Sequence, residues 1–158
     1  MHTKRFDKKL CDENDSLGKA IATDIMACLG FKLVRENTSE GVDFSEGFWD
    51  LEFEKGGKTI KVEVEVKNKK WWGDFDKKYP FKYDELNVPA RKKKNSADIY
   101  FLVSSDSKYA FAISGRNLKA CDIRPTYNKH VEDEDMYKIP YNKGFWFENI
   151  NGNWKKIT

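Results

Sequence analysis

The clearest hydrophobic pattern in the chain lies between residues 49 and 70. Apolar and polar residues alternate over 51–55, Gly56-Gly57 follows, and apolar residues then recur at every second position from Ile60 to Val66. This pattern predicts two strands joined by a tight turn, because successive strand side chains point to opposite faces. The valine face is expected to pack on a core, and the polar residues of the second strand then share the other face: Lys61, Glu63, Glu65 and Lys67.

The register of this hairpin brings acidic residues together. With the two glycines as turn residues, Asp50 lies opposite Glu63 and diagonal to Glu65. Carboxylate oxygens from adjacent strands are ligands that suit Mg²⁺, and Lys67 could position or help deprotonate a metal-bound water. The same Glu/Lys alternation is also typical of an exposed strand face that carries ion pairs for solubility. The pattern alone leaves both interpretations open.

The N-terminal part of the chain predicts a helix followed by a strand. A cap at Asp12, Asp15 or Ser16 starts the helix, which runs to about Leu29, with Gly30 in the left-handed position. Its apolar stripe is predicted to contain Leu17, Ile21, Ile25 and Cys28, widened by Leu29. Asp24 lies at the margin of this stripe, where its side chain either points into a site at the sheet edge or is simply exposed to water. The alternation in FKLVR predicts the next strand.

The C-terminal half predicts a helix and further strands. Residues Tyr83 to about Asn95 are predicted to be helical, with Pro89 starting or interrupting the helix. The nearly continuous apolar run from Ala97 to Ser104 predicts a buried strand, and Tyr109 to Ser114 a further one. The chain after this strand is expected to be irregular until an Asn-Gly turn at 151–152, which predicts a C-terminal hairpin.

Length and composition predict one folded domain over residues 1–158. The chain is 39% hydrophobic, 35% charged and 15% aromatic, which is typical of a folded protein with a charged surface. No apolar run is long enough to cross a membrane, and the N-terminus lacks the apolar centre of a secretory signal. We therefore expect no membrane partner and an intracellular, cytoplasmic location, in the host cytoplasm if the protein is viral. The three scattered cysteines and two histidines argue against a disulfide framework, a zinc site or a histidine-based triad.

The charge is unevenly distributed although the net charge is only +3. From Lys55 to Lys94 there are thirteen Lys or Arg against six Asp or Glu, which suits a surface that attracts phosphates. Trp71 and Trp72 could stack on exposed bases, or form a hydrophobic lid over the core. A solvated lysine-rich surface is the alternative for the basic residues. The candidate nucleic-acid-binding residues are Lys61, Lys69, Lys70, Trp71, Trp72, Arg91, Lys92, Lys93 and Lys94.

Several short motifs occur in an order that resembles the PD-(D/E)XK nuclease superfamily. They are Gly18, Asp24, LGF at 29–31, VR at 34–35, Asp50 in WDLEF and VEVK at 64–67. The order is closest to that of Holliday-junction-resolvase-like and restriction-endonuclease-like members, and the resemblance covers about Ser16 to Ser114. It implies an α/β fold with a restriction-endonuclease-like αβββαβ core, whose mixed central sheet is flanked by helices. The predicted C-terminal hairpin would be added to that core.

The resemblance also implies roles for individual residues. Asp50 matches the first metal ligand, Glu65 the second, and the backbone carbonyl of Val66 would complete the protein ligands for Mg²⁺ or Mn²⁺. Lys67 would attend the nucleophilic water, and Asp24 matches a helix position where many members place a Glu ligand. The chain departs from the pattern at three places: Trp49 replaces a proline, Asp24 is one methylene shorter than Glu, and Glu63 is an additional acid. Alternative metal ligands are Glu63, shifting the site by one pleat, and Asp43 in the loop before the hairpin.

The resulting functional hypothesis is a metal-dependent endonuclease that hydrolyses DNA phosphodiester bonds by direct water attack. A junction-resolvase-like member would be a homodimer, because two coordinated cuts need two sites. The first alternative is a non-catalytic nucleic-acid-binding module on the same fold, and the second is a structural or partner-binding protein.

Overall fold

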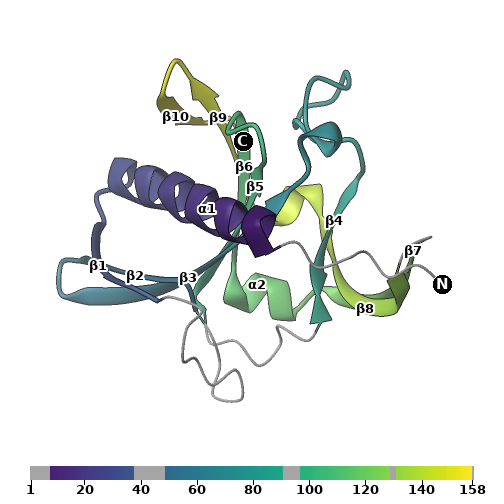
Figure 1. Cartoon of the computed structure of the whole chain (residues 1–158), viewed down its shortest axis with the longest axis horizontal. Helices are drawn as coiled ribbons and strands as arrows, with labels where there is room; N and C mark the ends of the chain where they lie inside the picture. Colours follow the sequence, from purple (N-terminus) through teal and green to yellow (C-terminus); the bar gives the residue numbers. More distant parts are fainter. Residues whose placement is uncertain (1–7, 38–48, 91–96, 129–130, 158) are drawn as a thin grey trace.

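The computed structural model describes residues 8–37, 49–90, 97–128 and 131–157, which form two sheets and two helices (Figure 1). Two short 3₁₀ helices, η2 (Lys69–Trp71) and η4 (Tyr141–Lys143), complete the regular structure. The helices and strands in chain order are α1 (Lys8–Cys28), β1 (Lys32–Glu36), β2 (Leu51–Lys55), β3 (Lys58–Lys67), β4 (Glu85–Pro89), β5 (Ile99–Ser104), β6 (Tyr109–Ser114), α2 (Gly115–Lys119), β7 (Asp122–Asn128), β8 (Val131–Pro140), β9 (Phe145–Ile150) and β10 (Asn153–Lys156).

The larger sheet has seven strands in the order β1-β2-β3-β5-β6-β9-β10. Only β3 and β5 pair in parallel in this sheet, so it is mixed, and the α/β class predicted from the sequence is confirmed. The second sheet has three antiparallel strands in the order β4-β8-β7. In Figure 1, α1 lies across the larger sheet, while β4, β7 and β8 gather at the other end of the molecule.

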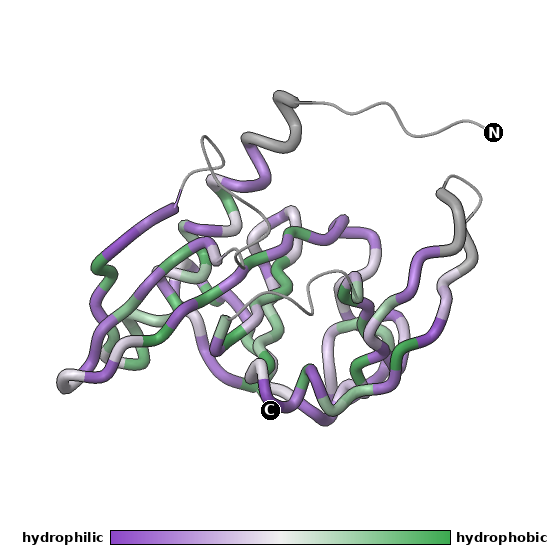
Figure 2. The backbone as a smooth tube through the Cα atoms, turned by 90° about the horizontal axis from the view of Figure 1, so that it is seen from below, coloured by the Kyte–Doolittle hydropathy of each residue, from purple (hydrophilic) through white to green (hydrophobic). Residues whose placement is uncertain are grey.

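The predicted hairpin forms β2 and β3 with the expected register. Gly56 and Gly57 have φ angles of 57° and 80°, which suit a two-residue hairpin turn with both residues in the left-handed region. Leu51 pairs with Val62, so that Asp50, one residue earlier, lies at the level of Glu63. The predicted register is therefore confirmed. Hydrophobic and hydrophilic positions alternate along the strands in Figure 2, which is the pattern from which the hairpin was predicted.

Helix α1 ends where the sequence predicts. The Gly30 amide donates to the Ala27 carbonyl and the Phe31 amide to the Met26 carbonyl, each at 3.0 Å, and Gly30 has a φ angle of 87°. This is a Schellman ending, which requires a residue in the left-handed region. The predicted apolar stripe is wrong at its C-terminal end, because Cys28 and Leu29 are exposed. The helix meets the sheet through a neighbouring face that includes Ala22 and Met26.

The larger sheet separates two hydrophobic cores. The core on the α1 side contains helix and strand residues: Ile21, Ala22, Ile25, Met26, Leu51, Phe53, Val62, Phe101, Val103, Ala110, Ala112, Phe147 and Trp154. The opposite core, here called the aromatic core, lies between the two sheets and includes Trp72, Tyr79, Phe81, Tyr100, Phe111, Tyr137 and Trp146. Four aromatic rings surround the Trp146 indole at centroid distances of 4.7–6.1 Å. Both faces of the larger sheet are thus covered, as expected for a sheet with parallel pairing.

The predicted helix from Tyr83 to Asn95 is wrong over its described part. Residues Glu85–Pro89 form strand β4, where Leu86 and Val88 alternate with polar residues and are buried. Proline is acceptable here because β4 is an edge strand, which leaves one side of the strand without ladder bonds. The stretch expected to be irregular after Ser114 is also ordered, as helix α2 and strands β7 and β8. By contrast, the predicted strands β5 and β6 and the hairpin of β9 and β10 are confirmed.

Gly18 allows α1 to approach β3 closely. A Cβ atom at Gly18 would lie 2.9 Å from Cγ1 of Val64 and 3.2 Å from Cγ2 of Val66. We therefore expect Gly18→Ala to lower the free energy of unfolding by about 1–2 kcal/mol in urea denaturation, despite the better helix propensity of alanine. Val64→Ala should also lower the free energy of unfolding, and in the double variant the total loss should be smaller than the sum of the two single losses. A Gly18→Ala protein more stable than the wild type would contradict this close packing.

Candidate active site

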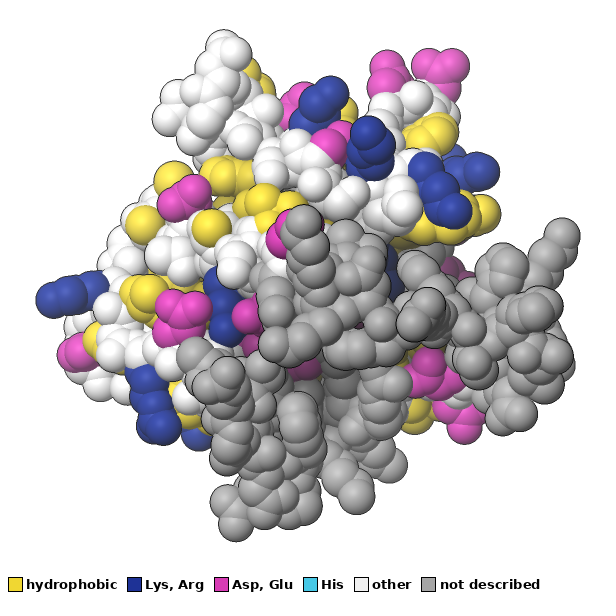
Figure 3. Space-filling model, viewed as in Figure 1, with side chains coloured by type: hydrophobic (Ala, Val, Ile, Leu, Met, Phe, Trp, Pro, Cys, Tyr) yellow, Lys and Arg dark blue, Asp and Glu magenta, His cyan; other side chains and the backbone are white. Residues whose placement is uncertain are grey.

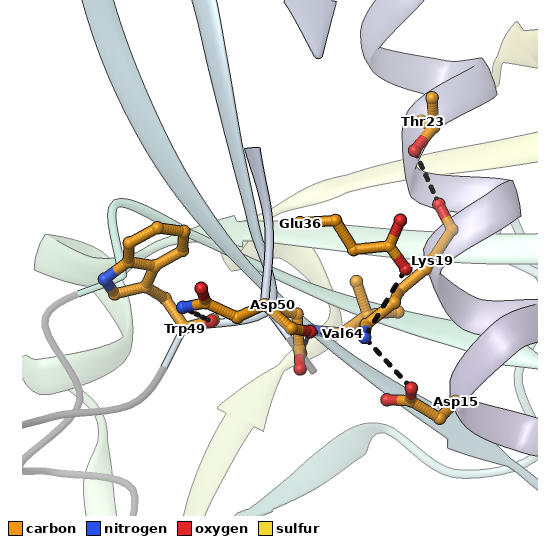
Figure 4. Close-up of polar contacts among 8 residues, drawn as sticks. Asp15, Lys19, Thr23, Glu36, Trp49, Asp50 and Val64 are labelled. Atoms are coloured by element: carbon orange, nitrogen blue, oxygen red, sulfur yellow. Dashed lines mark hydrogen bonds and ion pairs between the residues drawn. The ribbon is translucent and has the colours of Figure 1, made fainter. Parts of the chain in front are cut away.

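Asp50 continues the β2–β3 ladder with its side chain. It lies directly before β2 and is only 5% exposed. Its amide donates to the Val62 carbonyl at 2.9 Å, and its Oδ2 accepts from the Val64 amide at 2.8 Å (Figure 4). The carboxylate therefore takes the place beside β3 that an acceptor of the main chain would occupy if β2 began earlier in the chain.

The edge of β3 beyond β2 carries a second candidate oxygen ligand, the Val66 carbonyl. Strand β2 pairs with β3 from Lys58 to Val62, while β5 pairs with it from Val62 to Lys67 on the other side. The backbone groups of Lys61 and Lys67 bond toward the β5 side, and those of Val62 and Val64 toward Asp50. The N–H and C=O groups of successive residues point to opposite sides of a strand. The Val66 carbonyl, two residues after Val64, therefore points to the same side of β3 as Asp50.

Glu65 and Lys67 form an ion pair on the face of β3 that belongs to the aromatic core. Lys67 Nζ lies 3.3 Å from Glu65 Oε1, and the two side chains are 18% and 29% exposed, respectively. They lie in register with Leu102 and Ser104 of β5. Glu65 follows Val64, whose amide binds Asp50, so the Asp50 carboxylate is bound to β3 at the residue before Glu65. The structure thus brings Asp50 to the part of β3 that contains Glu65, Val66 and Lys67. These four residues are called here the β3 overhang.

The alternative ligand Glu63 has a different environment. It is 4% exposed and pairs in register with Tyr100 of β5. Burial, and secondarily the negative charge of Glu63, raise the pKa of the Tyr100 phenol. Glu65, which is half-buried, is more accessible to solvent than Glu63. The other alternative ligand, Asp43, lies outside the described residues.

Helix α1 presents Lys19 to this region, whereas Asp24 is exposed. The two residues are five positions apart, which corresponds to about 140° around the helix. Asp24 therefore points in another direction from Lys19. Its assignment as an additional metal ligand stays a prediction from the resemblance.

Lys19 is the residue that sequence reasoning missed. It is only 6% exposed, and its Nζ lies 2.6 Å from the Asn37 carbonyl oxygen, 3.0 Å from Asp15 Oδ2 and 3.6 Å from Glu36 Oε1. Figure 4 shows the amine between the two carboxylates. A signal was present in the sequence, because Lys19 shares a helix face with Ala22 and Met26 at spacings of three and seven.

Lys19 is connected to Asp50 through Asn37. The Asn37 carbonyl accepts from Lys19, the Asn37 amide donates to the Asp50 carbonyl at 2.8 Å, and its side-chain amide donates to the Trp49 carbonyl at 2.9 Å. The end of β1 and the start of β2 are thus held to α1. These contacts fix the backbone from which the Asp50 side chain reaches β3.

The predicted nucleic-acid-binding residues separate into three groups. Lys69 and Lys70 are exposed and Trp71 is half-buried, so these three are available to a ligand. Lys61 is half-buried with its amine 5.5 Å from the Trp49 ring centre, and Trp72 is 6% exposed. The proposal that Trp72 stacks on bases is wrong, because its indole belongs to the aromatic core. Residues 91–94 lie outside the described part of the chain.

The donor set at the β3 overhang suits a hard divalent cation. Two carboxylates and a backbone carbonyl are oxygen ligands, and Mg²⁺ commonly uses one or two carboxylates and keeps several waters. Among the described residues, no group of three or more His, Cys, Asp or Glu side chains has a metal-binding arrangement. A cation here would therefore depend on two carboxylates, the Val66 carbonyl and water.

Comparisons with protein-family models, curated proteins and solved structures gave no match. Neither described helix combines the length and apolar character needed to cross a membrane.

Proposed function

We propose that this protein is a metal-dependent nuclease that hydrolyses DNA phosphodiester bonds at the β3 overhang. The observation that carries the proposal is the hydrogen bond from the Val64 amide to Asp50 Oδ2, because it brings the Asp50 carboxylate to the strand that carries Glu65 and Lys67. Two carboxylates can hold a divalent cation, and a lysine beside them can act on the water and phosphate of a hydrolysis reaction, which supports the proposal.

The arrangement of the first elements supports a restriction-endonuclease-like core. Helix α1 precedes three antiparallel strands, and the next strand of the larger sheet, β5, pairs in parallel with β3. This agrees with the order α-β-β-β followed by a crossover and a further strand. The crossover differs from the αβββαβ order, because its described residues form η2 and β4 and contain no α-helix.

Asp50, Glu65 and the Val66 carbonyl would hold Mg²⁺ or Mn²⁺ in the proposed site. When bound, such an ion lowers the pKa of a coordinated water and screens the negative charge of the phosphate. Lys67 lies beside Glu65 and would orient the attacking water or neutralise charge that develops on the phosphate oxygens. The ion pair with Glu65 holds the Lys67 amine in place for this role.

DNA and a second copy of the chain are the proposed partners, and the proposed site of action is inside the cell. Lysines near the overhang supply the positive charge that DNA binding requires, with Lys69 and Lys70 exposed directly after β3. A homodimer would allow two coordinated cuts, as in the junction-resolvase-like hypothesis.

The proposal is tested by incubating the protein with labelled linear, single-stranded, flapped and four-way-junction DNAs in Mg²⁺, Mn²⁺ or EDTA. We expect cleavage of at least one DNA with either ion and none in EDTA. The preferred DNA would identify the substrate. Salt-sensitive binding without cleavage would instead favour the non-catalytic nucleic-acid-binding module.

A further inference from the structure

A group of aromatic and basic side chains, half-buried at Trp71 and otherwise exposed, lies in the segment after β3. It consists of Lys70, Trp71, Lys82 and Tyr83 and is called here the Trp71 patch. The Trp71 and Tyr83 rings are 5.4 Å apart between centroids, at an interplanar angle of 43°. The Lys70 and Lys82 amines lie 4.6 Å and 5.5 Å from the Trp71 ring centre. Tyr83 is 49% exposed, so aromatic surface is open to a ligand.

The backbone holds this patch in its shape. The Lys82 amide donates to the Trp71 carbonyl at 2.8 Å, and the Gly73 amide donates to the Pro80 carbonyl at 3.2 Å. The neighbouring residues Trp72 and Phe81 form a bridge and are buried in the aromatic core. Because Trp72 and Phe81 anchor the segment, Trp71 and Lys82 are presented together without further folding. A ligand would therefore meet a formed surface.

The charge of this segment suits a polyanion. Residues 69–83 contain five lysines and two aspartates. One of these lysines, Lys77, pairs with Asp84 at 3.2 Å, while Lys69, Lys70, Lys78 and Lys82 are exposed. Figure 3 shows lysine side chains beside apolar atoms at the upper right, where this segment lies. A half-buried Trp71 ring and an exposed Tyr83 ring beside lysines match the chemistry of nucleotides, which combine a flat base with a phosphate.

The Trp71 patch is close to the β3 overhang. The Ser105 amide donates to the Lys67 carbonyl at 3.0 Å, and Ser105 Oγ accepts from the Lys69 amide at 2.8 Å. The start of η2 is thereby anchored beside the end of β3. Trp71 is four positions after Lys67, so their Cα atoms are at most about 14 Å apart. One nucleic-acid strand of a few nucleotides could contact both places.

We propose that the Trp71 patch binds the unpaired bases of a single-stranded segment of nucleic acid. Stacking requires an open base face, which a base inside a duplex does not offer, so the patch selects substrates with a single-stranded end, flap or gap. This inference rests on the proposed function, because binding of single strands selects substrates only if the protein is a nuclease. The binding itself does not depend on catalysis and is measured in EDTA.

Trp71 provides a spectroscopic signal for this binding. Of the five tryptophans, the other four are each at most 9% exposed: Trp49, Trp72, Trp146 and Trp154. Titration of the full chain with an oligothymidylate of about ten nucleotides in EDTA should quench tryptophan fluorescence, because stacked bases quench an indole. The quenching should disappear in Trp71→Phe. A duplex of the same length should quench little.

Variants of Tyr83 and Lys82 test the patch with a matched control elsewhere. Phe145 is 53% exposed and has the Lys156 amine 4.2 Å from its ring centre, so it repeats the aromatic–lysine pair at another site. We expect Tyr83→Ala and Lys82→Met each to weaken oligothymidylate binding at least about fivefold. Phe145→Ala and Lys156→Met should leave it within about twofold.

Equal affinity for single strand and duplex, or equal losses in patch and control variants, would overturn the proposal. So would binding without a change in Trp71 fluorescence. Cleavage that fails in every metal while these binding results hold would contradict the nuclease proposal alone. Loss of single-strand selectivity with metal-dependent cleavage retained would contradict the patch alone.

Discussion

Glu65→Gln is expected to lower the rate of Mg²⁺-dependent DNA cleavage at least about 100-fold. The substitution removes the negative charge of a proposed metal ligand but keeps the size of the side chain. Replacing residues that only support metal ligands commonly costs about 10–100-fold, so loss of a ligand should cost at least as much. The measurement is a single-turnover time course with the preferred DNA. Binding of the same DNA in EDTA should change little.

The matched control for this variant is Glu54→Gln. Glu54 is an exposed glutamate on β2 of the same hairpin and pairs with Thr59, away from the β3 overhang. The Glu54→Gln variant should cleave DNA at the wild-type rate. If Glu65→Gln kept full activity, or Glu54→Gln lost as much, Glu65 would not be the ligand and Glu63 would become the next candidate.

Lys19→Met is expected to lower the free energy of unfolding by about 2–3 kcal/mol. The variant keeps an apolar stem of similar length but removes the amine of a residue that is 6% exposed, and this amine has three oxygen partners. The Asn37 carbonyl would lose its charged donor, and Asp15 and Glu36 would keep unpaired charges close together. Urea denaturation followed by circular dichroism measures the loss.

Lys32→Met provides a comparison for this loss, because Lys32 is exposed at the start of β1. It should change stability by less than about 0.5 kcal/mol. Cleavage by Lys19→Met should also fall under conditions where the variant is folded, because Lys19 holds Asn37, which binds the Asp50 backbone. A Lys19→Met protein as stable as Lys32→Met would show that the buried amine is not needed.

The features that sequence predicted correctly are those set by local chemistry. The Gly56-Gly57 turn determines the β2–β3 register, and that register brings Asp50 to the level of Glu63. Gly30 ends α1 for a similar reason, since its left-handed conformation suits glycine. In both cases the decisive interactions are between residues within about a dozen positions of each other.

The features that sequence missed depend on distant partners. Strand β4 pairs with β8, about fifty residues later, and this pairing overrides the helix predicted after Tyr83. Trp72 is buried because Phe81 and Trp146 enclose it, whereas its neighbour Trp71 is half-buried. From sequence alone Lys19 would be expected at the surface, because its contacts with Asn37 and Glu36 form only in the folded chain. To predict strand β4 or the burial of Trp72 and Lys19, one must know which distant segments of the chain lie next to each other.

The most direct test of the central claim locates the cation on the polypeptide. Fe²⁺ bound in place of Mg²⁺, with ascorbate and peroxide, produces radicals that cut the chain close to the ion, and mass spectrometry identifies the fragment ends. We predict cuts near Asp50 and between residues 64 and 67, suppressed by excess Mg²⁺ and absent in Glu65→Gln. Cuts elsewhere, or cuts at these positions that persist unchanged in Glu65→Gln, would contradict a metal site at the β3 overhang.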